Sequence, residues 1–412
     1  MRILFITNYY PPYEVGGYEQ LCRDVAEHLA RRGHVIQILT SDRGVAKHGP
    51  VNEVNVYRVL RLQLDYESGV SPAFQFLSHR RTEVYNLRCL RARIAEFAPD
   101  VIFIWNLQGL PYSLASEAEL ISGGHVAYWL AGYSPAEPDA FWVYWERLNG
   151  RSWRRPLKAL VRPLALGILR AEGKPVRPRM DHVAVVSEYI RRQGIAQGTL
   201  PAHARVIYNG VEVDRFYQPV QAHITGPLTV LQAGRVSADK GVHTAVEAIG
   251  RLVHEQGIRD VHLQIAGTGP AAYTASLQQL AKEYGIEDKV SFLGWVPRER
   301  MPELMARCHV LLLPTINQEP FARVALEAMA SGLVVIGTLT GGTGELLQHG
   351  VTGLAFSPGD SHDLTRQIRR LLQEPDLRRQ LATKGQQMVL ERFSLERMVS
   401  EVERLLGEAC TT

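Results

Sequence analysis

The chain opens on a short apolar run that is followed by a turn and an amphipathic helix. Residues 3–6 are apolar and β-prone, 10–17 are rich in Pro and Gly, and in 18–32 a Leu or Val recurs every fourth residue. Gly33 ends the helix, and a second apolar run spans 35–39. Strand, loop, helix and strand in this order predict a βαβ unit with parallel strands.

The same order of elements returns in the second half of the chain. An apolar run at 228–232 precedes a basic, glycine-containing loop at 234–241, a helical pattern at 242–254 and another apolar run at 261–266. Four further strand-like runs are separated by helical patterns; they span 101–105, 183–186, 310–313 and 334–337. This alternation predicts the α/β class, with two doubly wound, Rossmann-like domains.

A domain boundary is expected in 214–227, which has little apolar periodicity and contains two prolines. We therefore expect an N-terminal domain over 1–213 and a C-terminal domain over 228–393. The tail, 394–412, has the pattern of an amphipathic helix. This helix can pack back on the N-terminal domain or stay on the C-terminal domain, and the sequence leaves both arrangements open.

The composition excludes several classes of protein. With 412 residues, 46% hydrophobic and 21% charged, the chain suits two or three packed domains and is unlike a disordered or fibrous protein. Its four cysteines form no C-x-x-C pair, which argues against a disulfide framework and a thiolate metal site. Without a signal-peptide pattern or an apolar run near the roughly 18 residues of a membrane span, we expect a cytoplasmic protein. A net charge of +4 is too small to indicate nucleic-acid binding.

One stretch of the chain is strongly basic. Residues 147–179 hold ten Lys or Arg against one acidic residue, Glu172. Apolar residues at helical spacing accompany these charges, among them Trp153, Leu160 and Leu164. Two interpretations stay open. The stretch contacts an anionic membrane surface, which would place the protein peripherally at the inner membrane face, or it is a solvated helix and loop.

The richest candidate chemistry lies in 314–345. This segment follows the apolar run 310–313 and predicts a helix with Pro320 in its first turn. A helix N-terminus at the carboxyl end of a parallel sheet suits an anion such as a pyrophosphate. Glu319 and Glu327 are eight residues apart, about 80° in azimuth on one helix, and carboxylates accept hydrogen bonds from sugar diols. Taken alone, such a pair is more commonly a helix cap and a surface acid.

This segment resembles the E-x7-E signature of the retaining glycosyltransferases of family GT4, which have a GT-B fold of two Rossmann-like domains facing across a cleft. The resemblance extends over nearly the whole chain, because seven elements appear in the family's order. They are Gly16-Gly17, Ser187, Tyr208 to Val211, Gly234-Arg235 with Lys240-Gly241, Gly267 to Gly269, Glu319 to Glu327, and Gly341-Gly342 to Glu345.

The resemblance implies roles for individual residues. Arg235 and Lys240 would bind the donor diphosphate and Glu319 the transferred sugar, and these three are the expected catalytic residues. Two cations beside a glycine turn agree with that role, because they stabilise charge on a leaving phosphate. The plain alternative for both cations is a surface position. The expected donor-binding residues are Gly16, Gly17, Gly234, Gly267, Gly269, Phe321, Ala322 and Glu327. Among these, Glu327 would hold the nucleotide ribose, and Gly16-Gly17 has a plain turn as its rival interpretation.

The acceptor side is less well marked. Trp105, Asn106, Ala131 and Tyr133 are the candidates, although aromatic residues at such positions are more commonly core. Many family members carry a His where this chain has Ala131, and a Gly where it has Ala322. The chain has neither a D-x-D motif nor a His, Cys and Asp cluster with ligand spacing, so we expect no metal and no cofactor.

The expected function is retaining transfer of a sugar from a nucleotide diphosphate sugar to a glycan or lipid-linked acceptor. Two alternatives stay open. One is an enzyme of the same fold with a soluble sugar acceptor, of the sucrose or trehalose synthase type. The other is a non-catalytic protein that kept the nucleotide-sugar site, which Ala131 and Ala322 suggest.

Overall fold

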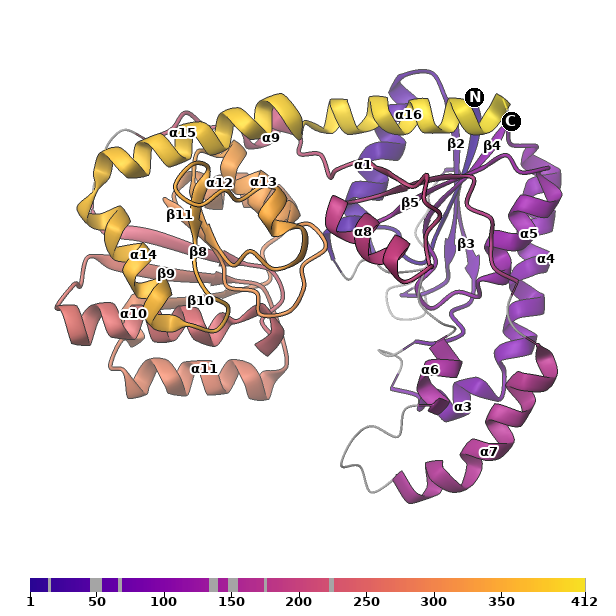
Figure 1. Ribbon diagram of the computed structural model, residues 1–412, viewed down its shortest axis with the longest axis horizontal. Coiled ribbons are helices and arrows are strands. Elements are labelled where there is room, and N and C mark those ends of the chain that lie inside the picture. The colour runs from indigo at the N-terminus through magenta and orange to yellow at the C-terminus, as the bar shows by residue number, and fades with distance from the viewer. Residues whose placement is uncertain are drawn as a thin grey trace. The chain divides into compact units, whose positions relative to one another are not determined.

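The computed structural model of the protein describes residues 1–13, 16–44, 54–65, 69–132, 140–146, 155–173, 176–221 and 226–411. They form two compact units (Figure 1). The first unit consists of Met1–Val186, Ile190–Ile207 and Val399–Thr412, and the second of Ser187–Tyr189 and Tyr208–Met398. Each unit is an α/β domain around one parallel sheet, as the alternating patterns predict.

The first unit contains a seven-stranded sheet in the order β3-β2-β1-β4-β5-β6-β7. Its central strands bury nearly every side chain, as expected of parallel strands covered on both faces. The strands are β1 (Arg2–Thr7), β2 (Val35–Ser41), β3 (Val56–Leu60), β4 (Val101–Asn106), β5 (Val126–Leu130), β6 (His182–Val185) and β7 (Arg205–Val206). The helices are α1 (Gly17–Arg31), α3 (Pro72–Phe76), α4 (His79–Phe97), α5 (Ser113–Ile121), α6 (Ala140–Glu146), α7 (Arg155–Glu172) and α8 (Glu188–Ala196), the last of which begins in the second unit.

A small apolar cluster joins α3, α6 and α7 within the first unit. Within it, the ring of Phe76 packs edge to face on those of Phe141 and Trp145. From α7 the cluster takes Ala165, Leu166 and Leu169. One face of α7 is therefore buried against α3 and α6.

The second unit contains a six-stranded parallel sheet in the order β10-β9-β8-β11-β12-β13. Counted along the chain this is the order 3-2-1-4-5-6, which is that of dinucleotide-binding folds. The strands are β8 (Leu228–Ala233), β9 (Val261–Ala266), β10 (Val290–Gly294), β11 (Val310–Leu313), β12 (Val334–Gly337) and β13 (Gly353–Ala355). The helices are α9 (Val213–Phe216), α10 (Val242–Gln256), α11 (Ala271–Glu283), α12 (Met301–Ala306), α13 (Arg323–Ala330), α14 (Ser361–Gln373) and α15 (Pro375–Arg392), and α16 (Leu395–Thr411) continues into the first unit. Three strands, β9, β11 and β12, have the bounds that the sequence predicts.

The structure places the domain boundary differently from the linker expected at 214–227. The described residues from Tyr208 to Met398 belong to the second unit, and the backbone of the first of them bonds to it. The Val211 N–H donates to the carbonyl of Phe393 (2.9 Å), and a Cβ at Gly210 would overlap the backbone of Leu395. A segment without apolar periodicity is thus held by main-chain contacts, which an apolar pattern cannot reveal.

The C-terminal residues from Val399 onward belong to the first unit. Glu403 on α16 accepts a hydrogen bond from His34 (2.7 Å), and its pKa lies below the usual value because of its bonds with His34 and Arg32. Farther along α16, Glu408 pairs with Arg205 at 2.6 Å. Within the described part of the chain, no helix is both long and apolar enough to cross a membrane.

Candidate functional site

The second sheet changes direction between β8 and β11, and ligands of such sheets bind at that point beyond the carboxyl ends of the strands. Two loops emerge there, 234–241 after β8 and 314–322 after β11. They are joined by backbone, because the Ile316 N–H donates to the carbonyl of Asp239 at 2.9 Å. Gly241, with a positive φ of 64°, lies so close to Pro314 that a Cβ would overlap its carbonyl oxygen. Only glycine fits both requirements.

This contact between the loops brings together Lys240 and Glu319, two of the three expected catalytic residues. The Lys240 ammonium forms an ion pair with a carboxylate oxygen of Glu319. Both side chains are partly exposed, so a ligand at the strand ends can reach them. The arrangement offers a cation for a diphosphate directly beside a carboxylate for sugar hydroxyls.

Arg235, the third expected catalytic residue, lies on the same loop and keeps 64% of its side chain exposed. Its guanidinium is 3.6 Å from the carboxylate of Asp239. Burial opposes ionisation of Asp239, but a hydrogen bond with Ser237 and the charges of Arg235 and Lys240 together lower its pKa. Asp239 therefore stays ionised and offsets part of the positive charge of the loop. Sequence reasoning missed this residue, although it stands between the two cations in the chain.

The helix expected to have Pro320 in its first turn begins later, which corrects one part of the sequence prediction. Ala322 is the N-cap of α13 and Arg323 its first residue, so Pro320 and Glu319 lie in the preceding loop. The azimuth argument for two glutamates on one helix does not apply, and Glu319 reaches the site from the loop. Glu327 is on α13, where one carboxylate oxygen lies 3.3 Å from Nε of Arg323.

Aromatic packing holds the chain just before α13. The ring of Phe321 packs on those of Tyr208 and Phe393, with centroids 5.2 and 5.7 Å away. Asn209 donates a side-chain hydrogen bond to the Phe321 carbonyl (3.3 Å). Burial and a hydrogen bond with Glu345 raise the pKa of Tyr208 to about 12. The side chains of Phe321 and Ala322 are buried, so these two residues can serve a ligand only through their backbone.

Glycines let the neighbouring loops pack main chain against main chain. A Cβ at Gly267 would overlap the carbonyl oxygen of Gly234, and one at Gly269 that of Val236. The backbone pairing of β8 and β9 continues past the strand ends, since Gly234 donates to Ala266 and Val236 to Thr268, both at 2.9 Å. Packing therefore explains Gly267 and Gly269, which the sequence assigned to donor binding.

The expected glycine pair of the first unit lies at the start of α1. Gly16 is the N-cap, with φ −156°, and its N–H donates to a carboxylate oxygen of Glu19 at 3.0 Å. Gly17 is the first helical residue. This backbone is open to any residue, and among the described residues a Cβ at Gly16 would make only an ordinary contact with Glu19. The packing of the chain thus does not itself require glycine at 16.

Trp105 does not line an acceptor site, which corrects the sequence prediction. Its side chain is fully buried, stacks on Trp129 with centroids 4.2 Å apart, and donates to the Tyr18 carbonyl at 3.1 Å. Trp105 is an inward-facing residue of a central strand. Of the other candidates, Ala131 is partly exposed after β5, and Tyr133 lies outside the described residues.

Asn106 lies at the point where the first sheet changes direction, between β1 and β4. Its carbonyl accepts a hydrogen bond from the backbone of Asn8 (3.0 Å), and the Tyr18 hydroxyl donates to Oδ1 of Asn8 (3.1 Å). Burial raises the pKa of Tyr18 well above its usual value, so the hydroxyl stays neutral. Sequence reasoning missed Asn8 and Tyr18; the signal for Asn8 was a polar residue directly after the apolar strand β1.

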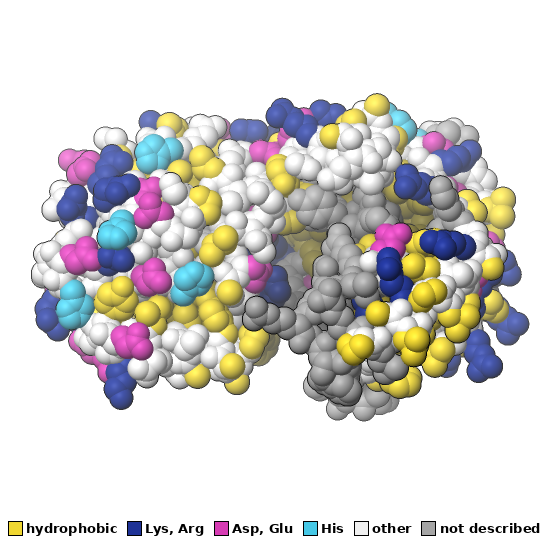
Figure 2. All heavy atoms as spheres, turned by 60° about the horizontal axis from the view of Figure 1, so that its bottom comes forward, with side chains coloured by type: hydrophobic (Ala, Val, Ile, Leu, Met, Phe, Trp, Pro, Cys, Tyr) yellow, Lys and Arg dark blue, Asp and Glu magenta, His cyan; other side chains and the backbone are white. Residues whose placement is uncertain are grey.

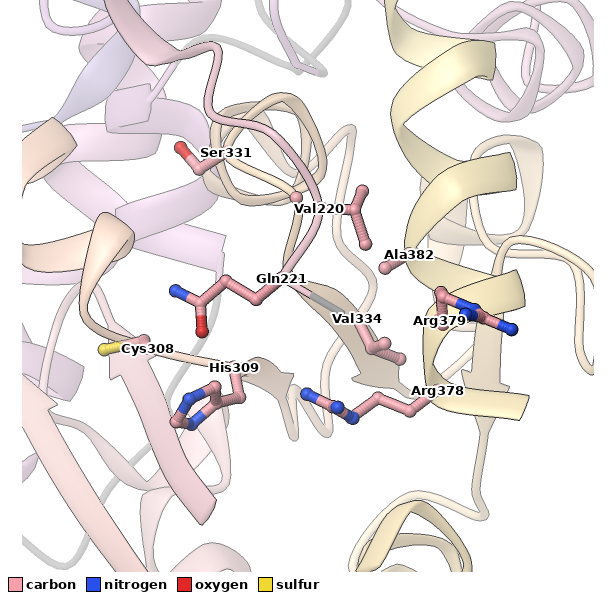
Figure 3. A pocket seen from close by; sticks show the side chains of 10 residues that line it. Val220, Gln221, Cys308, His309, Ser331, Val334, Arg378, Arg379 and Ala382 are labelled. Carbon is pink, nitrogen blue, oxygen red and sulfur yellow. The ribbon is translucent and has the colours of Figure 1, made fainter. Parts of the chain in front are cut away.

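A pocket elsewhere on the second unit is not a candidate for the donor (Figure 3). It lies before β11 and β12, at the opposite end of the sheet from Lys240, and is lined among others by His309, Gln221 and Arg378. Its cavity volume is about 10 Å³, close to the minimum that holds a single water molecule, so a nucleotide sugar does not fit. Burial and the charge of Arg378 lower the pKa of His309 to about 4, so this ring is neutral near pH 7.

Within the described residues, no group of three or more His, Cys, Asp or Glu side chains is arranged to hold a metal ion. The expected independence from metal stays a prediction.

Two family models match the chain in succession. The model described as Glycosyltransferase Family 4 matches residues 15–215, and the one described as Glycosyl transferases group 1 matches 214–388. Their division falls close to the boundary between the two units.

Curated relatives and solved structures agree with these matches. The N-acetyl-alpha-D-glucosaminyl L-malate synthase of Bacillus anthracis is 37% identical over 40% of the chain, which spans 42% of that relative. An uncharacterized glycosyltransferase, MJ1607 of Methanocaldococcus jannaschii, is 23% identical over 97% of the chain and 96% of its own length. The crystal structure of Anabaena HepE with UDP-glucose aligns over 99% of the chain and 100% of its own, at 20% identity and a TM-score of 0.69. The crystal structure of WaaG, a glycosyltransferase involved in lipopolysaccharide biosynthesis, aligns over 98% of the chain and 99% of its own, at 18% identity and a TM-score of 0.65. The fold is that of the GT-B glycosyltransferases.

Proposed function

Because the chain belongs to the group 1 and family 4 glycosyltransferases, we propose that it transfers a sugar with retention from a nucleoside diphosphate sugar to a glycan or lipid-linked acceptor. The observation that carries this proposal is the contact of Lys240 with Glu319 where the second sheet changes direction. The second unit then binds the donor, and the first unit the acceptor.

The charges at this site suit departure of a diphosphate. As the bond between the anomeric carbon and the phosphate oxygen breaks, negative charge grows on the leaving group, and Lys240 and Arg235 stabilise it. The acceptor oxygen forms its bond to the same face of the anomeric carbon, and its proton passes to a leaving phosphate oxygen. No enzymic nucleophile is needed. These two cations fill the role that a metal ion has in other transferases.

Two carboxylates orient the donor in this proposal. Glu319 accepts hydrogen bonds from hydroxyls of the transferred sugar, and Glu327 accepts them from the ribose. The backbone N–H groups near Phe321 and Ala322, at the start of α13, meet the phosphates. Support for a nucleotide-sugar donor also comes from HepE, whose crystal structure contains UDP-glucose.

The acceptor is the less constrained partner. One relative is called a lipopolysaccharide core biosynthesis glycosyltransferase, which favours a glycan or lipid-linked acceptor. A solved neighbour is a sucrose-phosphate synthase, so the soluble-acceptor alternative also has support.

A specific surface of the first unit favours an acceptor presented at a membrane. Beside its buried face, α7 has a second apolar stripe that faces solvent, with Leu160, Leu164 and Ile168 exposed by 78%, 69% and 40%. Phe74 on α3 and Leu77 directly after α3 are exposed as well. Figure 2 shows hydrophobic and basic side chains next to each other on this face. An exposed apolar stripe among cations is typical of helices that lie in a membrane interface. Of the basic stretch, residues 147–154, 174 and 175 lie outside the described residues.

We test the reaction by incubating the protein with UDP-, GDP- and ADP-sugars, without and with lipid extracts or soluble sugars, and by following the anomeric configuration with NMR. Release of sugar from one donor class, and transfer that keeps its configuration, is the expected result. Inversion would refute the retaining mechanism. A protein that binds a donor but neither hydrolyses nor transfers it would support the non-catalytic alternative.

We test the membrane contact by co-sedimentation with vesicles that contain anionic lipids. Leu160→Ser, Leu164→Ser and Ile168→Ser, combined in one variant, should abolish binding. The matched control is Leu120→Ser, which changes a similarly exposed leucine on α5. Equal binding by the triple variant and the wild type would exclude α7 as the contact.

A further inference from the structure

Asn209 is a buried polar side chain of the second unit, 7% exposed, beside the start of α13. Its amide nitrogen donates to the Phe321 carbonyl at 3.3 Å, whereas its Oδ1 accepts no hydrogen bond from the residues that the structure describes. A buried acceptor without a partner costs stability, and a leucine of similar shape would avoid this cost. Packing therefore does not explain the asparagine, and its N–H group is the part that has a partner.

The hydrogen bond from Asn209 fixes one peptide plane. The carbonyl of Phe321 and the N–H of Ala322 belong to the same trans peptide group, so they point in opposite directions. Because Asn209 holds the carbonyl on the buried side, the Ala322 N–H is turned to the other side. In the described part of the chain this N–H donates no hydrogen bond. It can therefore donate to a ligand.

This peptide group lies at the donor end of the second sheet. Ala322 is the N-cap of α13, and it comes three residues after Glu319, which pairs with Lys240. The start of a helix favours an anion through its unpaired N–H groups and its dipole. The preceding loop is held from another side, because the Gly342 N–H donates to the Glu319 carbonyl at 2.7 Å. The direction of the Ala322 N–H thus depends on Asn209 within a loop that is otherwise anchored.

We propose that Asn209 is a positioning residue, which holds the Phe321 carbonyl and thereby aims the Ala322 N–H at the diphosphate of the donor. This inference rests on the proposed function, since it concerns the same donor. Asn209 touches no reacting atom and acts through the main chain. A main-chain N–H carries no net charge, so salt screens its contribution to diphosphate affinity less than it screens that of the Lys240 ammonium.

The experiment compares the wild type, Asn209→Leu and Lys240→Ala by calorimetry, with inorganic pyrophosphate and with the nucleoside diphosphate that the wild type binds. Both ligands should bind Asn209→Leu about fivefold or more weakly. Added salt should leave this ratio to the wild type unchanged, while the ratio for Lys240→Ala should shrink. The melting temperature of Asn209→Leu should stay close to that of the wild type, because losing one hydrogen bond is offset by removing the unpaired acceptor.

Two further variants test the bond itself. In Asn209→Asp a protonated carboxyl can donate to the Phe321 carbonyl as the amide does, and an ionised one cannot. Measured against the wild type at each pH, this variant should bind pyrophosphate well at about pH 5 and poorly at about pH 9, since burial raises the pKa of a carboxyl into this range. Ala322→Pro removes the N–H, and the φ of −78° at this position suits proline. It should weaken pyrophosphate about 10-fold or more.

The matched control is Gln386→Leu. Gln386 is also 7% exposed, and its amide donates to the Ala330 carbonyl at 2.8 Å, at the other end of α13. This variant should lower the melting temperature and leave pyrophosphate affinity unchanged. Equal losses of affinity in Gln386→Leu and Asn209→Leu, or a loss in Asn209→Asp that does not depend on pH, would show that Asn209 only supports the helix.

The same measurements separate this inference from the proposed function. If Lys240→Ala weakens pyrophosphate while Asn209→Leu and Ala322→Pro stay within twofold of the wild type, the inference is overturned and the proposed function stands. Failure of the wild type to bind any nucleoside diphosphate overturns both.

Discussion

Replacing Glu319 by Gln separates the two roles that meet at the Lys240 ion pair. The substitution keeps the shape of the side chain and removes its charge. In the free protein Glu319 neutralises Lys240, so a diphosphate that binds Lys240 must compete with this carboxylate. Glu319→Gln removes the competitor, and free nucleoside diphosphate should then bind at least as tightly as it binds the wild type.

The size of this gain follows from the exposure of the pair. The side chains of Lys240 and Glu319 are 25% and 17% exposed, which places the pair between the fully exposed and the buried case. Opposite charges at about 4 Å attract by about 1 kcal/mol in water and about 4 kcal/mol near a protein surface, and measured exposed pairs give up to about 1 kcal/mol. A gain near 1 kcal/mol corresponds to an affinity about fivefold higher.

Turnover should change in the opposite direction. With a nucleotide sugar the variant loses the charged acceptor for the sugar hydroxyls, and a charge-assisted hydrogen bond is worth about 1.5–3 kcal/mol. We therefore expect kcat to fall by about 10- to 100-fold while affinity for the free nucleoside diphosphate is kept or raised.

Calorimetry with the nucleoside diphosphate and initial rates with the matching sugar donor measure the two effects. Glu327→Gln is the matched control, because it changes the glutamate assigned to the ribose and should weaken the free nucleoside diphosphate by about 10-fold or more. If Glu319→Gln binds it more than 10-fold more weakly and Glu327→Gln does not, the assignment of the pair is reversed.

Three other substitutions test separate parts of the account. Arg235→Ala should lower kcat/KM by about 10²-fold or more through lost stabilisation of the leaving group, with the melting temperature unchanged because its side chain is largely exposed; wild-type turnover would exclude it from catalysis. Gly267→Ala should lower the melting temperature, because a Cβ there meets the Gly234 carbonyl oxygen and φ is 143°. The control Gly257→Ala, also at positive φ but with free space around it, should lower the melting temperature less. Equal decreases in the two variants would contradict the packing of the loops. His309 is neutral when folded, with a pKa of about 4 against about 6.5 when unfolded, so the unfolded state binds more protons between these values. Stability should fall by about 1–3 kcal/mol, discounted for the partial exposure of the ring, as pH drops from 6.5 to 4. In His309→Gln this part of the pH dependence should be absent from urea unfolding curves, and an unchanged slope would locate it elsewhere.

The sheets could be predicted from the sequence because their strands are short apolar runs between helical patterns. The runs at 261–266, 310–313 and 334–337 became β9, β11 and β12 without shift. Partly buried edge strands give no such signal, which explains why β3 and β10 were not predicted. In β10 only Val290 is fully buried.

The candidate site could be predicted in part. Lys240 and Glu319 were singled out separately, but their ion pair depends on Gly241 lying against Pro314, a tertiary contact that spacing along the chain does not contain. Trp105 shows the reverse case. The sequence pattern of an aromatic residue near the carboxyl end of a strand is the same whether the ring faces the core or a ligand. Trp105 is buried because β4 is a central strand covered on both faces, so that all its residues from Val101 to Trp105 are buried. Asp239 was missed because its importance lies in offsetting the charges of its neighbours.

The central claim is that a nucleoside diphosphate sugar binds at the point where the second sheet changes direction. Calorimetric titration of the wild type and Lys240→Ala with a panel of UDP-, GDP- and ADP-sugars tests it most directly. The account predicts that one donor class binds the wild type and loses about 10-fold or more in affinity in Lys240→Ala. A donor that binds both proteins equally, or a wild type that binds no member of the panel, would contradict it.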